Sequence, residues 1–205
     1  MSHHKPVQAT LYISQQHPQL RDQVLGEMQG LLRNNTITWR SSEQQDAMAA
    51  VLECQMDIII ILLMGGGTSM LAIVPSLLEV NTTTVFVLPL NSLTTDYERR
   101  LFEMNIPHQV YKPDIELNLR DNLVIISAGK LQMASWHTAL ANLAHRGPLA
   151  CIVMDKAHIP LVAKDYHKSV KHMCDIQSEP VLLVLLSTTL PPSLMSHVSA
   201  TYLLL

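Results

Sequence analysis

Short apolar runs alternate with longer segments of helical periodicity along most of this chain, and this alternation constrains the fold more than any other feature. The apolar runs cover residues 58–64, 85–88, 123–127, 150–155 and 181–187, and the helical segments cover residues 70–78, 92–104 and 130–144. Continuous apolar strands separated by helices are typical of a parallel sheet that is covered on both faces. The sequence therefore predicts an α/β domain built from βαβ units.

The composition excludes several classes of protein. Hydrophobic residues make up 48% of the 205 residues and charged residues only 15%, which is incompatible with a disordered chain. The longest apolar run has 7 residues, whereas a membrane-spanning helix needs roughly 20, so no membrane partner is expected. The formal net charge of −3 argues against a protein that coats nucleic acid through net charge alone.

The three cysteines, Cys54, Cys151 and Cys174, lack C-x-x-C spacing and lie in or near apolar stretches. Such cysteines are typical of reduced core thiols in an intracellular protein. The N-terminal sequence MSHHKPVQ contains no apolar segment of a secretory signal, and no other targeting signal is found. The spacing of His167, His172 and Cys174 matches no zinc pattern, so these side chains are not expected to bind a metal.

Residues 1–38 differ from the rest of the chain because they are polar and rich in glutamine. Within them, apolar residues recur at spacings of three and four, which predicts one amphipathic helix. These residues are Leu20, Val24, Leu25, Met28, Leu31 and Leu32. We therefore expect a helical, polar extension over residues 1–38 and one α/β domain over residues 39–205.

Three glycines between the first apolar run and the first helical segment form the most informative motif. In M-G-G-G-T-S at residues 64–69, backbone N–H groups can surround an anion, and the following helix N-terminus adds partial positive charge. In the phosphate-loop pattern, a Lys and then a Ser or Thr follow the last glycine. Here Thr68 takes the place of the Lys, and Ser69 stands in the Mg²⁺ position. A glycine-rich turn that binds no ligand is the alternative for this segment taken alone.

Two later apolar runs end in polar side chains. Asp155 stands where an Asp at the carboxyl end of a parallel strand holds Mg²⁺ in phosphoryl-transfer proteins. Ser187, Thr188 and Thr189 end the last run. Three strand ends are therefore expected to present a hydroxyl or a carboxylate at one edge of the sheet.

Six segments, in order along residues 39–195, resemble the motifs of the first RecA-like domain of superfamily 2 helicases, and most closely those of RecQ-like helicases in fungi. They are W-R-S-S-E-Q at residues 39–44, M-G-G-G-T-S at 64–69, L-P-L-N-S-L at 88–93, S-A-G-K at 127–130, D-K-A-H at 155–158 and S-T-T at 187–189. The resemblance implies a RecA-like P-loop fold, with helices on both faces of a parallel sheet. It also implies ATP and Mg²⁺ as cofactors, DNA as a partner, ATP-driven 3′–5′ DNA unwinding and a nuclear location.

The resemblance assigns a role to each matched position. Gln44 would read the adenine base, and the phosphates would lie on Gly65, Gly66, Gly67, Thr68 and Ser69. Mg²⁺ would be held by Ser69 and Asp155, and hydrolysis would be coupled to strand movement by Ser187, Thr188 and Thr189. DNA would lie along Asn91, Ser92, Lys130, Lys164 and Lys168.

Two further observations bear on nucleic acid. Lys164, Lys168 and Lys171 recur at spacings of four and three, so a helix there would carry a basic stripe suited to phosphate contacts. A solvated helix face is the alternative interpretation of the same stripe. Aromatic residues are scarce, and Trp39 and Tyr166 are the candidates for stacking on bases.

Two departures from the family pattern fall on the chemistry. Thr68 lacks the positive charge that a Lys would place on the transferring phosphoryl group, and Lys156 replaces the acid expected to act as general base. A positioned general base typically contributes about 10²–10⁴ in rate. We therefore expect ATP hydrolysis to be lost, whereas the survival of ATP and Mg²⁺ binding is left open.

The family closes ATP between two RecA-like domains, and residues 39–205 match only the first of them. The resemblance thus implies that a partner protein would supply the second domain. Three alternatives stand beside a degenerate helicase domain. They are a working ATPase in which other residues replace the missing Lys and base, a non-catalytic module that binds a partner protein, and an eroded helicase fragment.

Overall fold

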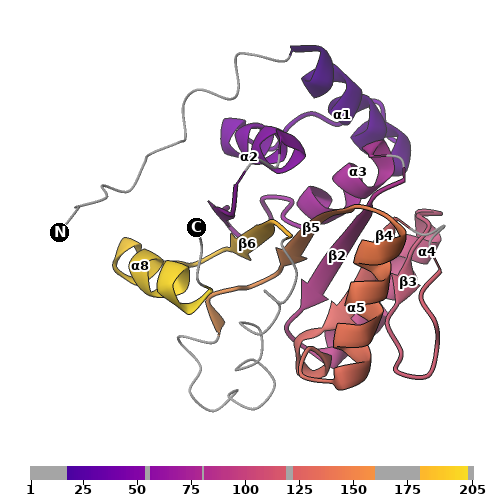
Figure 1. Ribbon diagram of the computed structural model, residues 1–205. Coiled ribbons are helices and arrows are strands. Elements are labelled where there is room, and N and C mark those ends of the chain that lie inside the picture. Colours follow the sequence, from indigo (N-terminus) through magenta and orange to yellow (C-terminus); the bar gives the residue numbers. More distant parts are fainter. Residues whose placement is uncertain (1–17, 54–55, 80, 119–121, 160–180, 203–205) are drawn as a thin grey trace.

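The computed structural model describes residues 18–53, 56–79, 81–118, 122–159 and 181–202. Within them the helices are α1 (Pro18–Leu31), α2 (Ser42–Glu53), α3 (Met70–Leu78), α4 (Asn91–Glu103), α5 (Ala134–Arg146) and α8 (Pro192–Thr201), with a 3₁₀ helix at Ala128–Lys130. The strands are β1 (Ile58–Ile61), β2 (Thr83–Leu88), β3 (Gln109–Val110), β4 (Leu123–Ser127), β5 (Leu149–Met154) and β6 (Leu183–Ser187). Figure 1 shows how these elements are arranged.

The six described strands form one sheet in the order β1-β6-β5-β2-β4-β3, and every neighbouring pair is parallel. All residues of β2, β4 and β6 are buried, as expected for strands that are covered on both faces. The predicted α/β fold with a parallel sheet is thus confirmed.

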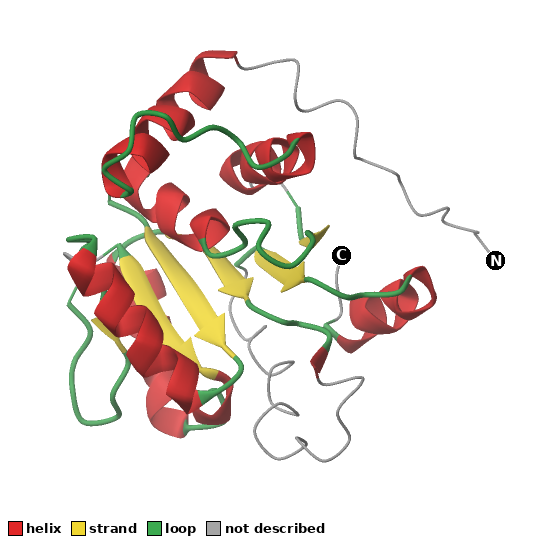
Figure 2. Ribbon diagram, turned by 180° about the vertical axis from the view of Figure 1, so that it is seen from behind, coloured by secondary structure: helices red, strands yellow, loops and turns green. Residues whose placement is uncertain are grey.

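Helices cover both faces of this sheet, and successive residues of each strand point to opposite layers (Figures 1 and 2). Val85 and Val87 of β2 belong to a core that includes buried residues of α5 and α8. Phe86 and Leu88 of the same strand belong to a second core, built with α1, α2, α3 and α4. The sheet therefore carries two cores, and both help to fix the positions of the strand ends.

The helix predicted near the N-terminus is present as α1, and it is part of the second core. Val24 and Met28 on its inner face are 1% and 3% exposed. They belong to the same buried cluster as Leu71 and Val74 of α3, the helix that follows the glycine motif. Helix α1 thus packs against α3, the helix that follows the glycine motif.

The first apolar run is longer than the strand it contains. We predicted a run to residue 64, but β1 ends at Ile61, which pairs with Ser187 at the end of β6. Beyond that point the chain leaves the sheet, and the side chains of Leu63 and Met64 are 84% and 86% exposed. The end of β6, the neighbour of β1 among the described strands, therefore coincides with the end of β1, although the apolar pattern continues.

Several sequence positions considered above lie outside the described residues. They are Cys54, Lys164, Tyr166, His167, Lys168, Lys171, His172 and Cys174. Among the residues that are described, Cys151 is buried in β5. No helix in the described part of the chain is both long enough and apolar enough to cross a membrane.

Candidate nucleotide-binding site

The carboxyl ends of the parallel strands bring most of the predicted site segments to one edge of the sheet. The glycine motif follows β1, Ser187 ends the neighbouring β6, and Asp155 follows β5 beside it. The L-P-L-N-S-L segment follows β2, and S-A-G-K follows β4. This is the edge at which open parallel sheets bind their ligands. The arrangement that the sequence predicts for the strand ends is therefore present.

The glycine motif forms a tight turn, and the backbone N–H groups at its end, just before α3, have no acceptor within the described residues. Gly65 and Gly67 have φ angles of +80° and +81°, a backbone conformation that residues other than glycine rarely adopt. The Gly66 N–H donates to the Leu63 carbonyl at 2.8 Å. Within the described residues, the N–H groups of Gly67, Thr68 and Ser69 donate to no acceptor. Three free N–H groups before a helix N-terminus are a suitable cradle for an anion.

Arg40, which precedes α2, and Gln44, in the first turn of α2, contact the glycine motif. Gln44 is only 1% exposed, and its Oε1 accepts a hydrogen bond from the Arg40 backbone N–H at 2.9 Å. Its Nε2 lies directly against Gly67, where any side chain would collide with it. The Arg40 Nη1 donates to the Gly65 carbonyl. The sequence placed Gln44 in the site, but it gave no signal that the Arg40 side chain contacts the glycines.

Ser69, the predicted Mg²⁺ ligand that ends the motif, already has a protein partner. Its hydroxyl lies 2.8 Å from the hydroxyl of Tyr97 on α4, and the Tyr97 ring packs edge-on against Phe86 of β2. Burial raises the pKa of the Tyr97 phenol, the hydrogen bond to Ser69 opposes that shift, and the charge of Asp155 adds to it. Tyr97 therefore stands in a part of the site where sequence reasoning expected no phenol.

Asp155 lies at the end of β5 with its carboxyl group largely buried. The residue is 7% exposed, and this burial raises its pKa, whereas the charge and the backbone N–H of Lys156 oppose the shift. Lys156 has a φ angle of +54°, a left-handed conformation that costs a non-glycine residue roughly 1–2 kcal/mol. The residue at the expected general-base position is therefore a cation beside a buried carboxyl group.

These residues do not fit a resident Mg²⁺ ion in the arrangement described. Mg²⁺ takes oxygen ligands in a near-ideal octahedron. Of the two predicted oxygens, the Ser69 hydroxyl is bonded to Tyr97, and the carboxyl group of Asp155 is buried beside the charge of Lys156. Within the described residues, no group of three or more His, Cys, Asp or Glu side chains could hold a metal ion.

The predicted coupling segment contacts D-K-A-H through His158. The Ser187 hydroxyl lies 2.8 Å from His158 Nδ1, and the Thr189 hydroxyl lies 3.5 Å from Nε2. The Thr189 backbone N–H also donates to the Ser187 hydroxyl at 3.4 Å. Partial burial and the charge of Lys156 lower the pKa of His158. Thr188 makes no side-chain contact of this kind within the described residues.

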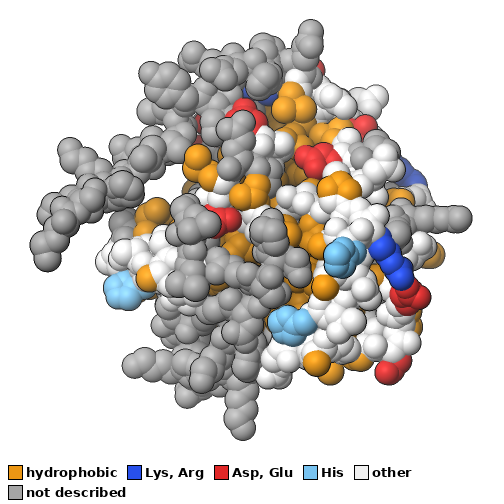
Figure 3. Space-filling model, viewed as in Figure 1, with side chains coloured by type: hydrophobic (Ala, Val, Ile, Leu, Met, Phe, Trp, Pro, Cys, Tyr) orange, Lys and Arg blue, Asp and Glu red, His pale blue; other side chains and the backbone are white. Residues whose placement is uncertain are grey.

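The predicted nucleic-acid residues lie at the same edge but differ in exposure. Asn91 and Ser92 are exposed in the first turn of α4, whereas the Lys130 ammonium donates to the Tyr111 carbonyl at 3.1 Å. Trp39, a predicted stacking residue, packs partly buried against the second core. On the face shown in Figure 3, the coloured Lys and Arg side chains are few and do not gather into a patch.

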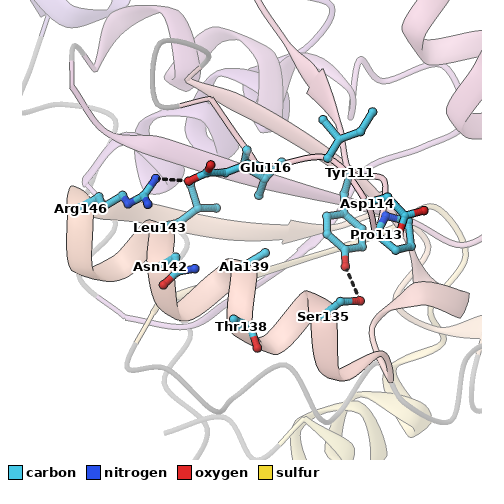
Figure 4. A pocket seen from close by; sticks show the side chains of 12 residues that line it. Tyr111, Pro113, Asp114, Glu116, Ser135, Thr138, Ala139, Asn142, Leu143 and Arg146 are labelled. Carbon is cyan, nitrogen blue, oxygen red and sulfur yellow. Dashed lines mark hydrogen bonds and ion pairs between the residues drawn. The ribbon is translucent and has the colours of Figure 1, made fainter.

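A cavity of about 360 Å³ lies away from the glycine motif, between α5 and the segment after β3 (Figure 4). A hydrogen bond from the Tyr111 hydroxyl to Ser135 and an ion pair between Arg146 and Glu116 bridge the two walls. None of the predicted site residues lines this cavity.

Comparison with known proteins gives one informative result. No family model and no curated protein matches the sequence. Among solved structures, the chain is similar to the DUF1998 helicase MrfA bound to DNA and AMPPNP, with a TM-score of 0.56 and 17% identity. The match covers 85% of this chain and 27% of that helicase. With the parallel sheet and its two helical layers, it shows that the chain has a RecA-like α/β fold, which it shares with the matched part of that helicase.

Proposed function

We propose that this chain is a helicase-type RecA-like module that binds a nucleoside triphosphate and nucleic acid without hydrolysing the nucleotide. The cradle of three free N–H groups at Gly67, Thr68 and Ser69 carries the nucleotide part of the proposal. The similar helicase is described as bound to AMPPNP and DNA, which supports the same two classes of ligand.

The loss of hydrolysis follows from two side chains. Thr68 brings no positive charge to the phosphate chain, and Lys156 cannot accept a proton from water while it is charged. The positive charge of Lys156 lies close enough to Asp155 to oppose the rise that burial causes in the pKa of that carboxyl group.

The finer parts of the proposal rest on the sequence motifs. They are the RecQ-like kind of helicase, DNA as the nucleic acid, a nuclear location and a partner protein that supplies a second RecA-like domain. Asn91 and Ser92 support contact with nucleic acid because their side chains are exposed at the same edge of the sheet as the glycine motif.

A module that binds only a protein partner is the second candidate. It is favoured by Leu63 and Met64, two large apolar side chains that are 84% and 86% exposed beside the glycines. Neighbouring apolar side chains exposed to this degree are typical of interaction surfaces.

Calorimetric titration of the purified chain with ATP tests the proposal. We expect binding in the micromolar range, and we expect Thr68→Glu to weaken it at least about tenfold by placing a negative charge in the cradle. Thr138→Glu on α5 is the matched control, because Thr138 is exposed and distant in the chain from the glycines. A wild-type chain that binds no ATP would contradict the proposal and favour the protein-binding module.

A further inference from the structure

We propose that Arg40 supplies the positive charge that Thr68 does not, and that the glycine loop binds a nucleotide phosphate chain without a metal ion. This inference rests on the proposed nucleotide-binding function and deepens it. It concerns how the phosphate charge is balanced, which the proposed function leaves unassigned.

The first observation is the position of Arg40. Its guanidinium crosses from the start of α2 to the glycine loop, where Nη1 donates to the Gly65 carbonyl. Its backbone is fixed on the Gln44 side chain, since the Arg40 N–H donates to Gln44 Oε1 at 2.9 Å. Arg40 is thus held at the cradle although 25 residues separate it from Gly65.

The second observation is that no acidic side chain among the described residues pairs with Arg40. Within the described residues, Arg40 forms no ion pair, and its only side-chain hydrogen bond goes to a neutral carbonyl. A guanidinium has five N–H donors in a planar fork that matches a phosphate group. Most of these donors, and the full positive charge, are therefore left for an anion at the loop.

The third observation is the amide group of Gln44. The side chain is 1% exposed, and its Nε2 donates to no acceptor within the described residues. Nε2 points at the Cα of Gly67, the first of the three residues whose N–H groups are free. Gln44 therefore holds the Arg40 backbone through Oε1 and packs against the glycine loop through Nε2. An anion in the cradle would accept hydrogen bonds from the three free backbone N–H groups.

The last observation explains why a metal ion is not required. Ser69, which would otherwise contact Mg²⁺, is bonded to the Tyr97 hydroxyl at 2.8 Å. This hydrogen bond satisfies Ser69 without a metal ion. Because Thr68 carries no charge and Lys156 lies beside Asp155, Arg40 is the cation that the described residues place against the loop.

The test measures ATP affinity by calorimetry, with Mg²⁺ and with excess EDTA, for the wild-type chain, Arg40→Gln and Arg99→Gln. We expect the wild-type affinity to change by less than about threefold between the two conditions. Arg40→Gln should weaken binding at least about tenfold in both, the loss expected for one charge-assisted hydrogen bond. Arg99 is the matched control, since it is exposed on α4 and paired with Asp96 and Glu103.

A second variant separates the charge of Arg40 from its contact with Gly65. Adding Thr68→Lys to Arg40→Gln returns a cation to the loop from the other side without restoring the Gly65 contact. Recovery of ATP binding in this double variant supports the charge role. No recovery, with unchanged thermal melting, would show that Arg40 only holds the loop and would overturn the inference.

The remaining outcomes are distinguishable. Binding that requires Mg²⁺, or that is unchanged in Arg40→Gln, would overturn the inference and leave the proposed nucleotide binding in place. Absence of ATP binding by the wild-type chain in both conditions would overturn the proposed function itself, and this inference with it.

Discussion

The two ends of the candidate site differ in how completely the protein satisfies its own polar groups. At the D-K-A-H end, Ser187, Thr189 and His158 are joined by hydrogen bonds within the protein. At the glycine end, three backbone N–H groups and the Gln44 amide nitrogen have no acceptor within the described residues. The hydroxyl groups and the imidazole of the first end have partners within the protein, whereas the second end has donors that an anion would satisfy. This difference supports the proposal that the glycine end binds an anion, whereas hydrogen bonds at the D-K-A-H end stabilise the fold.

The largest effect on stability is expected from a substitution in the second core. Phe86 of β2 is fully buried and packs edge-on against Tyr97, with ring centres 5.3 Å apart. Phe86→Ala should lower the free energy of unfolding by about 3–5 kcal/mol, because it leaves a cavity in the core. Urea denaturation followed by circular dichroism measures this. A loss below about 1 kcal/mol would show that the second core does not stabilise the site as described.

A smaller effect is expected at the glycine end. Gly67→Ala should cost about 1–2 kcal/mol of folding free energy, since φ is +81° there and the new methyl group would meet the Gln44 amide. Gly147→Ala is the matched control, because its backbone is extended and its nearest new contact, the Asn81 carbonyl, lies at 3.8 Å. If both substitutions cost the same amount, the tight approach of Gln44 to the glycines is wrong.

At the D-K-A-H end, Ser187→Ala removes the hydroxyl that contacts His158 and accepts from the Thr189 N–H. We expect a loss of about 1 kcal/mol in folding free energy, as for a typical hydrogen bond, and no change in ATP affinity. Thr188→Ala serves as the control because Thr188 makes no such contact within the described residues. Weaker ATP binding in Ser187→Ala alone would contradict the separation of the two ends.

The smallest effect concerns pH. The pKa of His158 is lowered in the folded chain, so the unfolded chain binds this proton more tightly. His158 therefore contributes stability that is fully present above its ordinary pKa of about 6.5 and is lost as the pH falls from there through the lowered pKa of the folded chain. Unfolding midpoints measured from pH 8 to 5 should fall less steeply for His158→Asn than for the wild type. An identical slope in the two chains would exclude this contribution.

The sheet and its helices could be predicted because their signals are local. The segment at residues 70–78 became α3 with the same bounds, and the run at residues 123–127 became β4. The two-residue strand β3 was not predicted, because Gln109 and Val110 are too few to show a period and are only partly buried. Helices α2 and α8 also had no separate prediction, since polar residues interrupt their apolar pattern.

The candidate site could be predicted only where a residue stands in a sequence motif. Asp155 and Ser187 stand in motifs at strand ends and Gln44 in one at the start of α2, and the roles of all three stay predictions. The contacts of Arg40 with Gly65 and of Tyr97 with Ser69 join residues 25 and 28 positions apart. Helical periodicity could place Tyr97 on a helix, but it contains no information about which loop the hydroxyl meets. Such contacts depend on how α2 and α4 pack against the sheet.

The fate of bound ATP tests the central claim most directly. The purified chain, at a concentration that saturates it with radiolabelled ATP, is incubated with single-stranded DNA, and the nucleotide in the mixture is identified by chromatography. We predict that the nucleotide is recovered as the triphosphate, because Thr68 and Lys156 stand where the catalytic Lys and base would be needed. Recovery as the diphosphate, at a rate raised by DNA, would contradict the account.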